Sequence, residues 1–500
     1  MSMRGATSTT SASTTSGIDA IAWPLALLVL TAGCPGDDGS GTGDPTTAMA
    51  TVGSSSGPAS TETAPGETTQ ATDPTLTGPS TLDATTTAAD SDTGNPTTGE
   101  TPASCGDGVP DPDEACDDGN GIDADGCNND CTISGSVLWF HGQPGGAGQS
   151  EEAWGIAVDS EGRAYVAGDR HNGVDLDHWI RQYEDDGIGW TLVLDQGGGT
   201  NDGARGAAVR GTTLYTIGYR AVAGQSNNTW LRSFDLDGNA GITVEYNDTL
   251  NGSNVGQGIA IDPGGTVIAV GQHTVGSLEV SHVDAWIRAH TPAGAPVWTA
   301  NYGGAATDQA RAVATDGAGN VAVVGYSVVG GQNDLWVRVF DPSGTPLWTA
   351  THANPNGLDD DAQGVAFDPD GNVVVAGWEL DPVIPWRVWL TKYDPAGAEL
   401  WTQPWDGETG EGARAFAVTV DDEGDIVITG QHRAAGVTSL LVRKLDPSGE
   451  GKWTTLVEGY EGTGQVGRAV AIGPGRRVWV AGGVDQGVDG RDAFVARLAP

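Results

Sequence analysis

The chain has 500 residues, 78 of them glycine and 26 proline, and its 66 acidic residues against 23 basic ones give a formal net charge of −43. A chain this acidic lacks the basic surface that grips a phosphate backbone, which excludes nucleic-acid binding. Only 18% of its residues are charged, too few for a coiled coil or a long-helix protein. The acids are unevenly placed, since residues 35–104 hold ten acids and residues 105–131 hold nine, and neither segment contains a base.

Residues 1–33 have the pattern of an export signal. An apolar run from Ala20 to Leu30 follows a polar stretch with one base, and eleven residues are too few to span a bilayer as a finished helix. The run ends in Leu30-Thr31-Ala32-Gly33-Cys34, which resembles the bacterial lipobox with Thr31 where leucine is usual. The resemblance implies that Cys34 is lipidated and becomes the mature N-terminus. The alternatives are an ordinary secretory signal and a retained anchor.

Residues 34–104 carry the expected lipid and continue as a linker. Beyond Cys34 the segment consists of Thr, Ser, Gly, Pro, Ala and acids, with almost no large apolar side chain. Such a composition buries too little surface to offset the entropy of the chain, so we expect a disordered stalk. A flexible stalk of this length has a root-mean-square reach on the order of 45 Å. It would hold the rest of the chain away from a membrane.

Residues 105–131 contain the other four cysteines: Cys105, Cys116, Cys127 and Cys131. The segment includes Cys-Gly-Asp-Gly at 105–108, Glu-Ala-Cys-Asp-Asp-Gly-Asn at 114–120 and Asp-Gly-Cys at 125–127. These elements resemble the myxobacterial-type disulfide-rich repeat. The resemblance implies two disulfides, in keeping with export to an oxidising compartment. Four cysteines allow three pairings, and the sequence does not choose among them.

The same segment is rich in oxygen ligands, which suit calcium. The candidate ligands are Asp117, Asp118, Asn120, Asp123 and Asp125. Their spacing does not match an EF-hand loop, and the alternative is that these Asp-Gly and Asn-Gly steps serve turns. Zinc is not expected, because the segment lacks both histidine and closely spaced cysteine pairs. Calcium is the one cofactor for which the sequence offers ligands.

From about residue 136 the sequence repeats with a period close to 52 residues. A glycine ends an apolar strand at positions 168, 218, 271, 325, 377, 430 and 482. A second column occurs at Trp179, Trp230, Trp286, Trp336, Trp389, Leu441 and Phe494. Two columns with the same number of members and the same period establish seven repeats. We expect the large side chains of the second column to pack between sheets.

Each repeat contains four strand-like runs separated by turn signals. In the fourth repeat these are Ala310–Asp316, Asn320–Ser327, Leu335–Phe340 and Pro346–Ala350. Four strands in about 50 residues is the unit of a β-propeller blade. The last repeat lacks its fourth strand, and the segment 137–140, Val-Leu-Trp-Phe, matches the fourth strands of other repeats. We therefore expect residues 136–141 to complete the last blade and close the ring.

The repeats, such as residues 308–325, resemble the bacterial seven-bladed β-propeller repeat of the SBBP type. The resemblance covers residues 132–500 and implies an all-β fold, a seven-bladed β-propeller. It transfers no activity, because the family occurs in many exported bacterial proteins.

Two polar columns mark the first strand of each repeat. One consists of Trp154, Arg205, Gln257, Arg311, Gln363, Arg414 and Arg468, each followed by a small residue. The other consists of Glu151, Asp202, Asn254, Asp308, Asp360, Glu411 and Gln465. These columns predict rings near one mouth of the central channel, which form either a cation or anion site or structural salt bridges and turn caps. Repeat-wide columns usually serve the repeat, which favours the structural interpretation.

Ligand-binding candidates lie where the repeat is broken, in the loops between blades and between the second and third strands. Trp378, Trp386 and Trp405 are candidates for a platform on which a sugar stacks, and Asp359, Asp360 and Asp361 are candidates for binding a cation. Motifs for a nucleophile elbow, a zinc protease and a P-loop are absent from the sequence.

The sequence therefore predicts a monomeric lipoprotein of the cell envelope, anchored at the outer membrane or cell surface. Its propeller would bind a protein or polysaccharide without catalysing a reaction. The alternatives are a propeller enzyme that acts on glycans, as a hydrolase or lyase, and a purely structural envelope protein.

Overall fold

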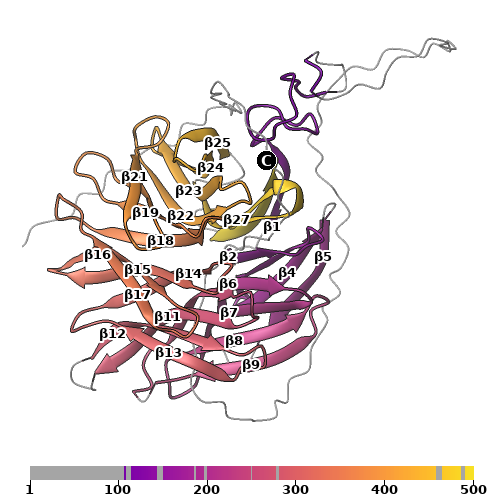
Figure 1. Cartoon of the computed structure of the whole chain (residues 1–500). Coiled ribbons are helices and arrows are strands. Elements are labelled where there is room, and N and C mark those ends of the chain that lie inside the picture. The colour runs from indigo at the N-terminus through magenta and orange to yellow at the C-terminus, as the bar shows by residue number, and fades with distance from the viewer. Residues whose placement is uncertain are drawn as a thin grey trace, which may run out of the picture.

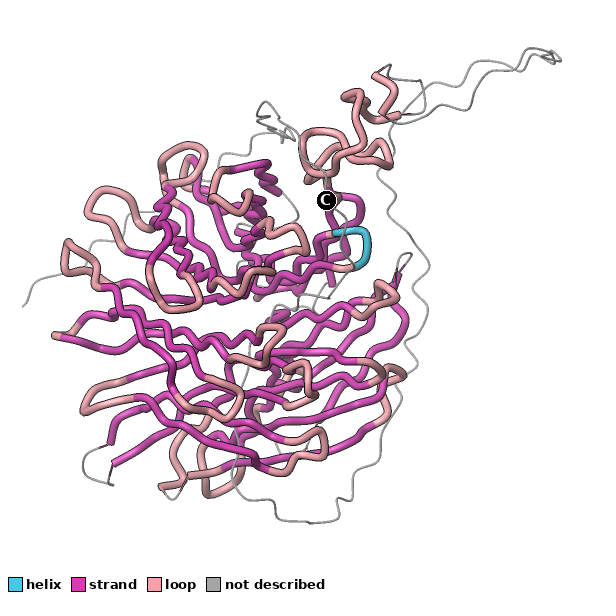
Figure 2. Tube along the Cα trace, viewed as in Figure 1, coloured by secondary structure: helices cyan, strands magenta, loops and turns pink. Residues whose placement is uncertain are grey.

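The computed structural model describes residues 106–108, 114–143, 150–184, 187–195, 200–248, 250–276, 281–457, 464–485 and 490–500. The lipobox, Cys34, the linker and Cys105 lie outside these residues. Within them the chain is almost entirely β-structure, and the one helix is the 3₁₀ turn Pro474–Arg476 (Figure 2). The described residues contain no helix long and apolar enough to cross a membrane.

The strands follow one another along the chain in groups of four. The first group is β2 (Glu151–Val158), β3 (Ala164–His171), β4 (Leu176–Glu184) and β5 (Gly187–Leu194). The second is β6 (Asp202–Arg210), β7 (Thr213–Ala221), β8 (Asn227–Asp235) and β9 (Ala240–Tyr246). The third is β10 (Val255–Ile261), β11 (Val267–Gly276), β12 (Ser281–His290) and β13 (Pro296–Tyr302). Next come β14 (Asp308–Thr315), β15 (Val321–Val329), β16 (Gln332–Phe340) and β17 (Pro346–His352), then β18 (Asp360–Phe367), β19 (Val373–Glu379), β20 (Arg387–Tyr393) and β21 (Glu399–Trp405). Each of these five groups is a separate antiparallel sheet.

The remaining eight strands form one sheet made of two such groups. The strands are β22 (Ala413–Val420), β23 (Ile426–Ala434), β24 (Val437–Leu445), β25 (Gly451–Val457), β26 (Gly464–Ile472), β27 (Val478–Asp485), β28 (Arg491–Leu498) and β1 (Val137–Gln143). β22–β25 pair in order, as do β26, β27, β28 and β1. A single parallel bridge between Thr438 and Gly464 joins the two groups. The expected pairing of residues 137–140 with the C-terminal strands is confirmed.

The groups are arranged in a ring, as in a β-propeller (Figure 1). The first strand of each group contacts the first strand of the next, from β2 through β6, β10, β14, β18 and β22 to β26, and β26 contacts β2 again. The fourth strands lie at the rim, where half-buried and exposed positions alternate, as in β17. The four strands expected in the fourth repeat are those observed as β14–β17, with ends that differ by three residues at most.

The two sequence columns face each other across the second and third strands. Gly168 pairs with Trp179 and Gly482 with Phe494, and the other five glycines pair in the same way with their counterparts. A β-carbon at Gly271 would collide with the Trp286 ring and with the carbonyl of Val255. All five tryptophans of the column are at least 98% buried, as expected for packing between sheets. Each of the main apolar clusters therefore joins two neighbouring groups, for example Val270 and Ile287 with Val313 and Trp336.

The cysteine-rich segment packs against the last two groups of strands in the ring. Ala124 belongs to the apolar cluster that contains Trp453, and Asp130 forms an ion pair with Arg477 at 3.2 Å. The amide of Gly135 donates to the carbonyl of Pro500 at 3.2 Å, and its carbonyl accepts the Thr455 hydroxyl at 2.6 Å. The segment thus contacts the last two groups of strands next to the C-terminus (Figure 1).

Candidate functional site

A bulge occurs near the start of every first strand. The residue that loses its cross-strand partner is Trp154, Arg205, Gln257, Arg311, Gln363, Phe416 or Arg468. We call these seven residues the bulge ring. A bulge bends a strand and redirects one side chain. Here it turns a polar or aromatic side chain out of the apolar pattern of each first strand.

The structure corrects one member of the polar column expected from the sequence. The bulge of β22 lies between Ala415 and Ala417, so the sixth member is Phe416, and Arg414 lies two positions earlier. The reason is the register with β23, in which Ala415 pairs with Gly430 as Ala153 pairs with Gly168. A sequence signal for Phe416 exists, since it precedes Gly430 by the same fourteen residues that separate Trp154 from Gly168. The same shift moves the sixth position of the acidic column from Glu411 to Ala413.

Four neighbouring members of the bulge ring are joined by guanidinium groups stacked on aromatic rings. The Trp154 ring lies 4.2 Å from the Arg205 guanidinium carbon on one side and 4.6 Å from that of Arg468 on the other. Arg468 also lies 4.8 Å from the Phe416 ring. These contacts run between neighbouring sheets, which places the ring where the first strands converge. Such contacts contribute about 0.5–1 kcal/mol each when partly exposed.

Acids of adjacent sheets neutralise several of the ring arginines. Arg205 contacts Asp169 at 2.7 Å, Arg311 contacts Asp361 at 3.0 Å, and Arg468 contacts Glu152 at 2.8 Å. Each pair joins two sheets, as the structural interpretation expects, but the acids are not those of the expected acidic column. Burial raises the pKa of Asp169 to about 6, against the opposing effect of Arg205. Arg491 on β28, which the sequence did not single out, also contacts Glu152 at 2.8 Å.

The acidic column instead serves the strand ends and the connecting loops. Glu151 pairs with Arg170 at 2.9 Å, and Asp308 accepts the amide of Gly304 at 3.0 Å. Asn254 donates to the carbonyl of Gly252 at 3.0 Å. These side chains are buried, with at most 5% of their surface exposed. They therefore have the turn-capping and salt-bridging roles of the structural interpretation.

Small side chains surround the axis immediately beyond the bulge ring. A cavity there is lined by Gly155, Ala207, Gly364, Ala417 and Ala469, together with Gln363 and apolar neighbours. A β-carbon at Gly155 would lie 2.7 Å from the backbone of Gly206 and Ala207. The crowding explains why the column after the bulge holds only glycine and alanine. The bulge ring is consequently the polar mouth of a tightly packed, apolar axis.

The three candidate tryptophans do not share one contact. Arg414 lies 4.3 Å from the Trp386 ring, and Arg443 lies 4.5 Å from the Trp405 ring. Trp378 lies on β19, opposite Asp361. All three are partly exposed. Arginines thus stack on two of the rings that were expected to form a platform for sugars.

The three consecutive aspartates each have a different partner. Asp359 accepts the amide of Asn333 at 2.8 Å, Asp360 accepts the amide of Leu335, and Asp361 pairs with Arg311. Asp360 and Asp361 are almost completely buried. Among the described residues no group of three or more His, Cys, Asp or Glu side chains is placed to hold a metal ion.

A cluster of titratable groups surrounds Asp360. His352 Nε2 lies 3.6 Å from Glu379, which also faces Arg387 at 3.6 Å. Burial raises the pKa of Asp360 to about 7, and the interaction with the Glu379 carboxylate raises the pKa of His352. Raised carboxyl pKa values are typical of general acids. Asp360 is fully buried, however, so a substrate cannot reach it unless the structure around it opens.

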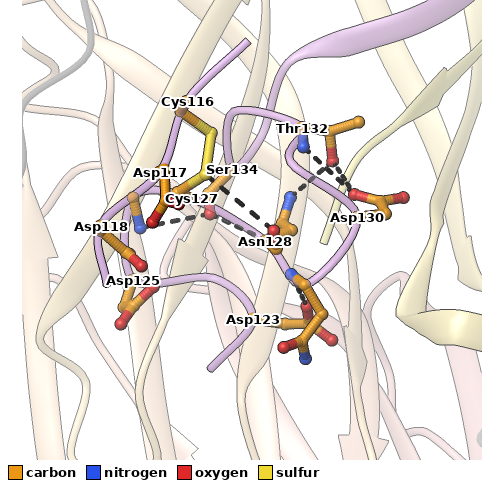
Figure 3. Close-up of a disulfide and its surroundings, with 12 residues drawn as sticks. Cys116, Asp117, Asp118, Asp123, Asp125, Cys127, Asn128, Asp130, Thr132 and Ser134 are labelled. Carbon is orange, nitrogen blue, oxygen red and sulfur yellow. Dashed lines mark hydrogen bonds between the residues drawn. A yellow bond between two sulfur atoms is a disulfide. The ribbon is translucent and has the colours of Figure 1, made fainter. Parts of the chain in front are cut away.

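In the cysteine-rich segment Cys116 and Cys127 form a disulfide, with their Cα atoms 5.7 Å apart (Figure 3). Cys131 is also disulfide-bonded. Asp117 accepts the amides of Asp107, Gly108 and Gly119, and these bonds lower its pKa.

The other calcium candidates also bind within the segment. Asp123 accepts the amide of Asn129 at 2.8 Å, Asp118 accepts the amide of Asn120 at 3.3 Å, and Asn120 donates to Asp125 at 3.1 Å. All five candidate side chains therefore form hydrogen bonds within the segment.

No protein-family model and no curated protein matches the chain. Solved structures resemble it weakly. A protein of unknown function from Dyadobacter fermentans matches 73% of this chain and 98% of its own, with 9% identity and a TM-score of 0.44. The polysaccharide lyase Uly1 matches 69% and 89%, with 12% identity and a TM-score of 0.45. Sqt1 of Chaetomium thermophilum, bound to the N-terminus of ribosomal protein L10, matches 73% and 100%, with 13% identity and a TM-score of 0.39. At scores below 0.5 these likenesses carry no argument about function.

Proposed function

We propose that this protein is a seven-bladed β-propeller lipoprotein of the bacterial cell envelope that binds a protein or polysaccharide without catalysing a reaction. Cys34 would carry the lipid, residues 35–104 would act as the stalk, and residues 105–131 would cap the ring. The seven sequence repeats, the closure of β26 onto β2 and the pairing of β1 with β28 support the blade count.

The observation that carries the binding role is the bulge ring. It places arginine and aromatic side chains, which dominate recognition surfaces in general, at one mouth of a rigid ring. Arg205, Arg311 and Arg468 keep 20%, 28% and 17% of their side-chain surface exposed. The start of β2 pairs with the end of β3, where Glu151 faces Arg170. The linker that enters a first strand and the loop that leaves a second strand therefore lie at the same face of the ring. A ligand on this face would contact both the bulge ring and the variable loops.

The enzyme alternative rests on the cluster around Asp360. A hydrolase or lyase needs a carboxyl group with a raised pKa and a second group to take or supply a proton. Asp360 and His352 have such properties, but the hydrogen bond of Asp360 with the Leu335 amide and the contact of His352 with Glu379 give both groups a structural role. The binding role is therefore preferred.

The test is a glycan array and a panel of envelope proteins probed with the full chain, with a panel of glycan hydrolase and lyase assays in parallel. We expect saturable binding without turnover. Turnover that Asp360→Asn abolishes would establish the enzyme instead. Neither binding nor turnover would favour a purely structural role.

The anchor is tested separately in the native host. We expect the mature chain in the membrane fraction, with a lipid-modified N-terminal peptide by mass spectrometry. Cys34→Ala should release it into the soluble fraction. Retention of the Cys34→Ala chain in the membrane would contradict lipidation at this residue.

A further inference from the structure

Positive charge is concentrated at one side of the mouth of the ring. Arg468 and Arg491 contact the same oxygen of Glu152, each at 2.8 Å. Arg414 lies beside them on β22 and donates to the side-chain oxygen of Gln431 at 3.1 Å. Among the described residues Arg414 forms no ion pair. Arg468 and Arg491 therefore share one carboxylate, and Arg414 has no acid of its own among these residues.

The three guanidinium groups are close enough to repel one another. Burial, followed by the charges of Arg468 and Arg491, lowers the pKa of Arg414 to about 10. Burial likewise lowers the pKa of Arg468, against the opposing effect of Glu152, and Arg491 and Arg205 lower it further. Asp169, the next carboxylate along the mouth, is committed to Arg205 and Trp154. An added negative charge would relieve this repulsion.

The Arg414 side chain is held in a defined orientation. Its guanidinium carbon lies 4.3 Å from the Trp386 ring and 4.9 Å from the Phe416 ring. Its Nε atom is buried and has no hydrogen-bond partner among the described residues. A planar guanidinium that retains an unpaired donor matches the chemistry of a carboxylate or sulfate group.

The surrounding charge limits the size of the anion. Residues 132–500 carry 46 acids and 22 bases, so most of the surface repels a negatively charged polymer. Arg205 and Arg311, the other arginines of the bulge ring, each have an acid of their own, whereas Arg414 in the patch of Arg414, Arg468 and Arg491 has none among the described residues. A single anionic group fits this patch, whereas a chain with an anion on every unit would extend over acidic surface.

We propose that the mouth of the ring is a site for one oxyanion group, a carboxylate or a sulfate, bound by Arg414 with Arg468 and Arg491. This inference deepens the proposed binding function and rests on it for the identity of a larger ligand. The anion would be either a free ion or the single charged group of a larger ligand, such as the terminal uronate of a saccharide.

The test is calorimetric titration of the full chain in low-chloride buffer with sulfate, with glucuronate and with glucose as the neutral control. We expect sulfate or glucuronate to bind in the millimolar range or tighter and glucose not to bind. Arg414→Gln should weaken anion binding by roughly tenfold or more, the loss of one charge-assisted contact.

Arg443→Gln is the matched control. Arg443 belongs to the same group of strands and also stacks on a tryptophan, but it has its own acid, Glu408, at 3.1 Å. Its replacement should leave anion affinity within about twofold. Binding of sulfate alone would identify a free ion as the ligand, and tighter binding of glucuronate would identify a uronate. Absence of anion binding, or equal affinity in Arg414→Gln and the unmodified chain, would overturn the proposal.

Different results would overturn the proposed binding function and the proposed oxyanion site. Anion binding that depends on Arg414, with no ligand on the array, would retain the site and remove the larger binding role. An array ligand that binds Arg414→Gln as well as the unmodified chain, and that sulfate does not displace, would retain the binding role and remove the oxyanion site.

Discussion

Single residues in this fold are selected by the partner that they face. The strand-ending glycines lie opposite the tryptophan column because a β-carbon there would strike the ring and the neighbouring carbonyl, as at Gly271. The same packing leaves several titratable side chains fully buried. Their protonation should therefore affect the stability of the ring.

His178 is one of these side chains, completely buried against Trp230. Burial, with a smaller contribution from Arg232, lowers its pKa to about 3. Below pH 6.5 His178 binds a proton in the unfolded chain but stays neutral in the folded chain. The folding stability therefore falls as the pH falls from 6.5 toward 3. His178→Phe should remove up to about 3 kcal/mol of this loss between pH 6.5 and 4. Urea unfolding of both chains at several pH values measures the difference, and parallel profiles would contradict the prediction.

Asp360 should give the folding stability the opposite dependence on pH. Its folded pKa of about 7 lies above the ordinary value of 3.8, so the folded chain holds a proton that the unfolded chain has lost between these values. Stability due to this group therefore falls as the pH rises from about 4 to 7. Asp360→Asn should remain more stable than the unmodified chain at pH 8, by up to about 4 kcal/mol, and lose the advantage near pH 4. An advantage that does not change with pH would show that the carboxyl is ionised when folded.

At the scale of elements, the bulged first strand is the unit on which both packing and the site depend. The bulge puts a polar or aromatic residue at the mouth of the ring, and the residue after it must be small because neighbouring first strands approach closely. The mouth and the packed axis are thus produced by the same local irregularity.

Gly155 tests this constraint. Its β-carbon would lie 2.7 Å from the backbone of the next first strand, so Gly155→Ala should destabilise the chain by about 1–3 kcal/mol. Gly317 is the control, because a β-carbon there meets nothing within 4 Å and its backbone is not left-handed. Thermal unfolding should give Gly155→Ala a lower melting temperature than Gly317→Ala. Equal stability would mean that the first strands move apart without cost.

The cysteine-rich segment offers a second test at this scale. Asp117 accepts three backbone amides, so Asp117→Asn should speed hydrogen exchange of the Gly108 and Gly119 amides whether or not calcium is present. Asp381→Asn is the control, because Asp381 caps a turn far along the chain. A calcium-induced slowing of exchange that Asp117→Asn removes would instead establish a calcium site.

At the scale of the whole molecule, stability depends on how the ring is closed. β1 comes from the start of the repeat region and pairs with the C-terminal strand β28. Trp139 packs edge-on against Trp479, and Phe140 stacks on Phe494 at 5.2 Å. The last sheet is thus completed by a strand that lies more than 350 residues away in the sequence.

Deleting residues 136–141 should therefore open the ring. We expect a lower melting temperature and oligomers in size-exclusion chromatography, because the deletion exposes the edge of β28 and the Phe494 ring. The matched control removes six residues from within 35–104 and should leave both properties unchanged. A monomeric product as stable as the control would argue against closure by β1.

The sequence by itself determined the strands, the turns, the two buried columns and the return of residues 137–140 to the last sheet. These features are periodic and local, so the same pattern occurs in repeat after repeat of a single sequence. Only the tertiary structure decided which charges meet at the mouth. Arg491 shares Glu152 with Arg468, and Phe416 replaces Arg414 in the bulge ring, because strand register and ring closure place these residues together. The two contacts with Glu152 join residues 316 and 339 positions apart, and no sequence spacing specifies them.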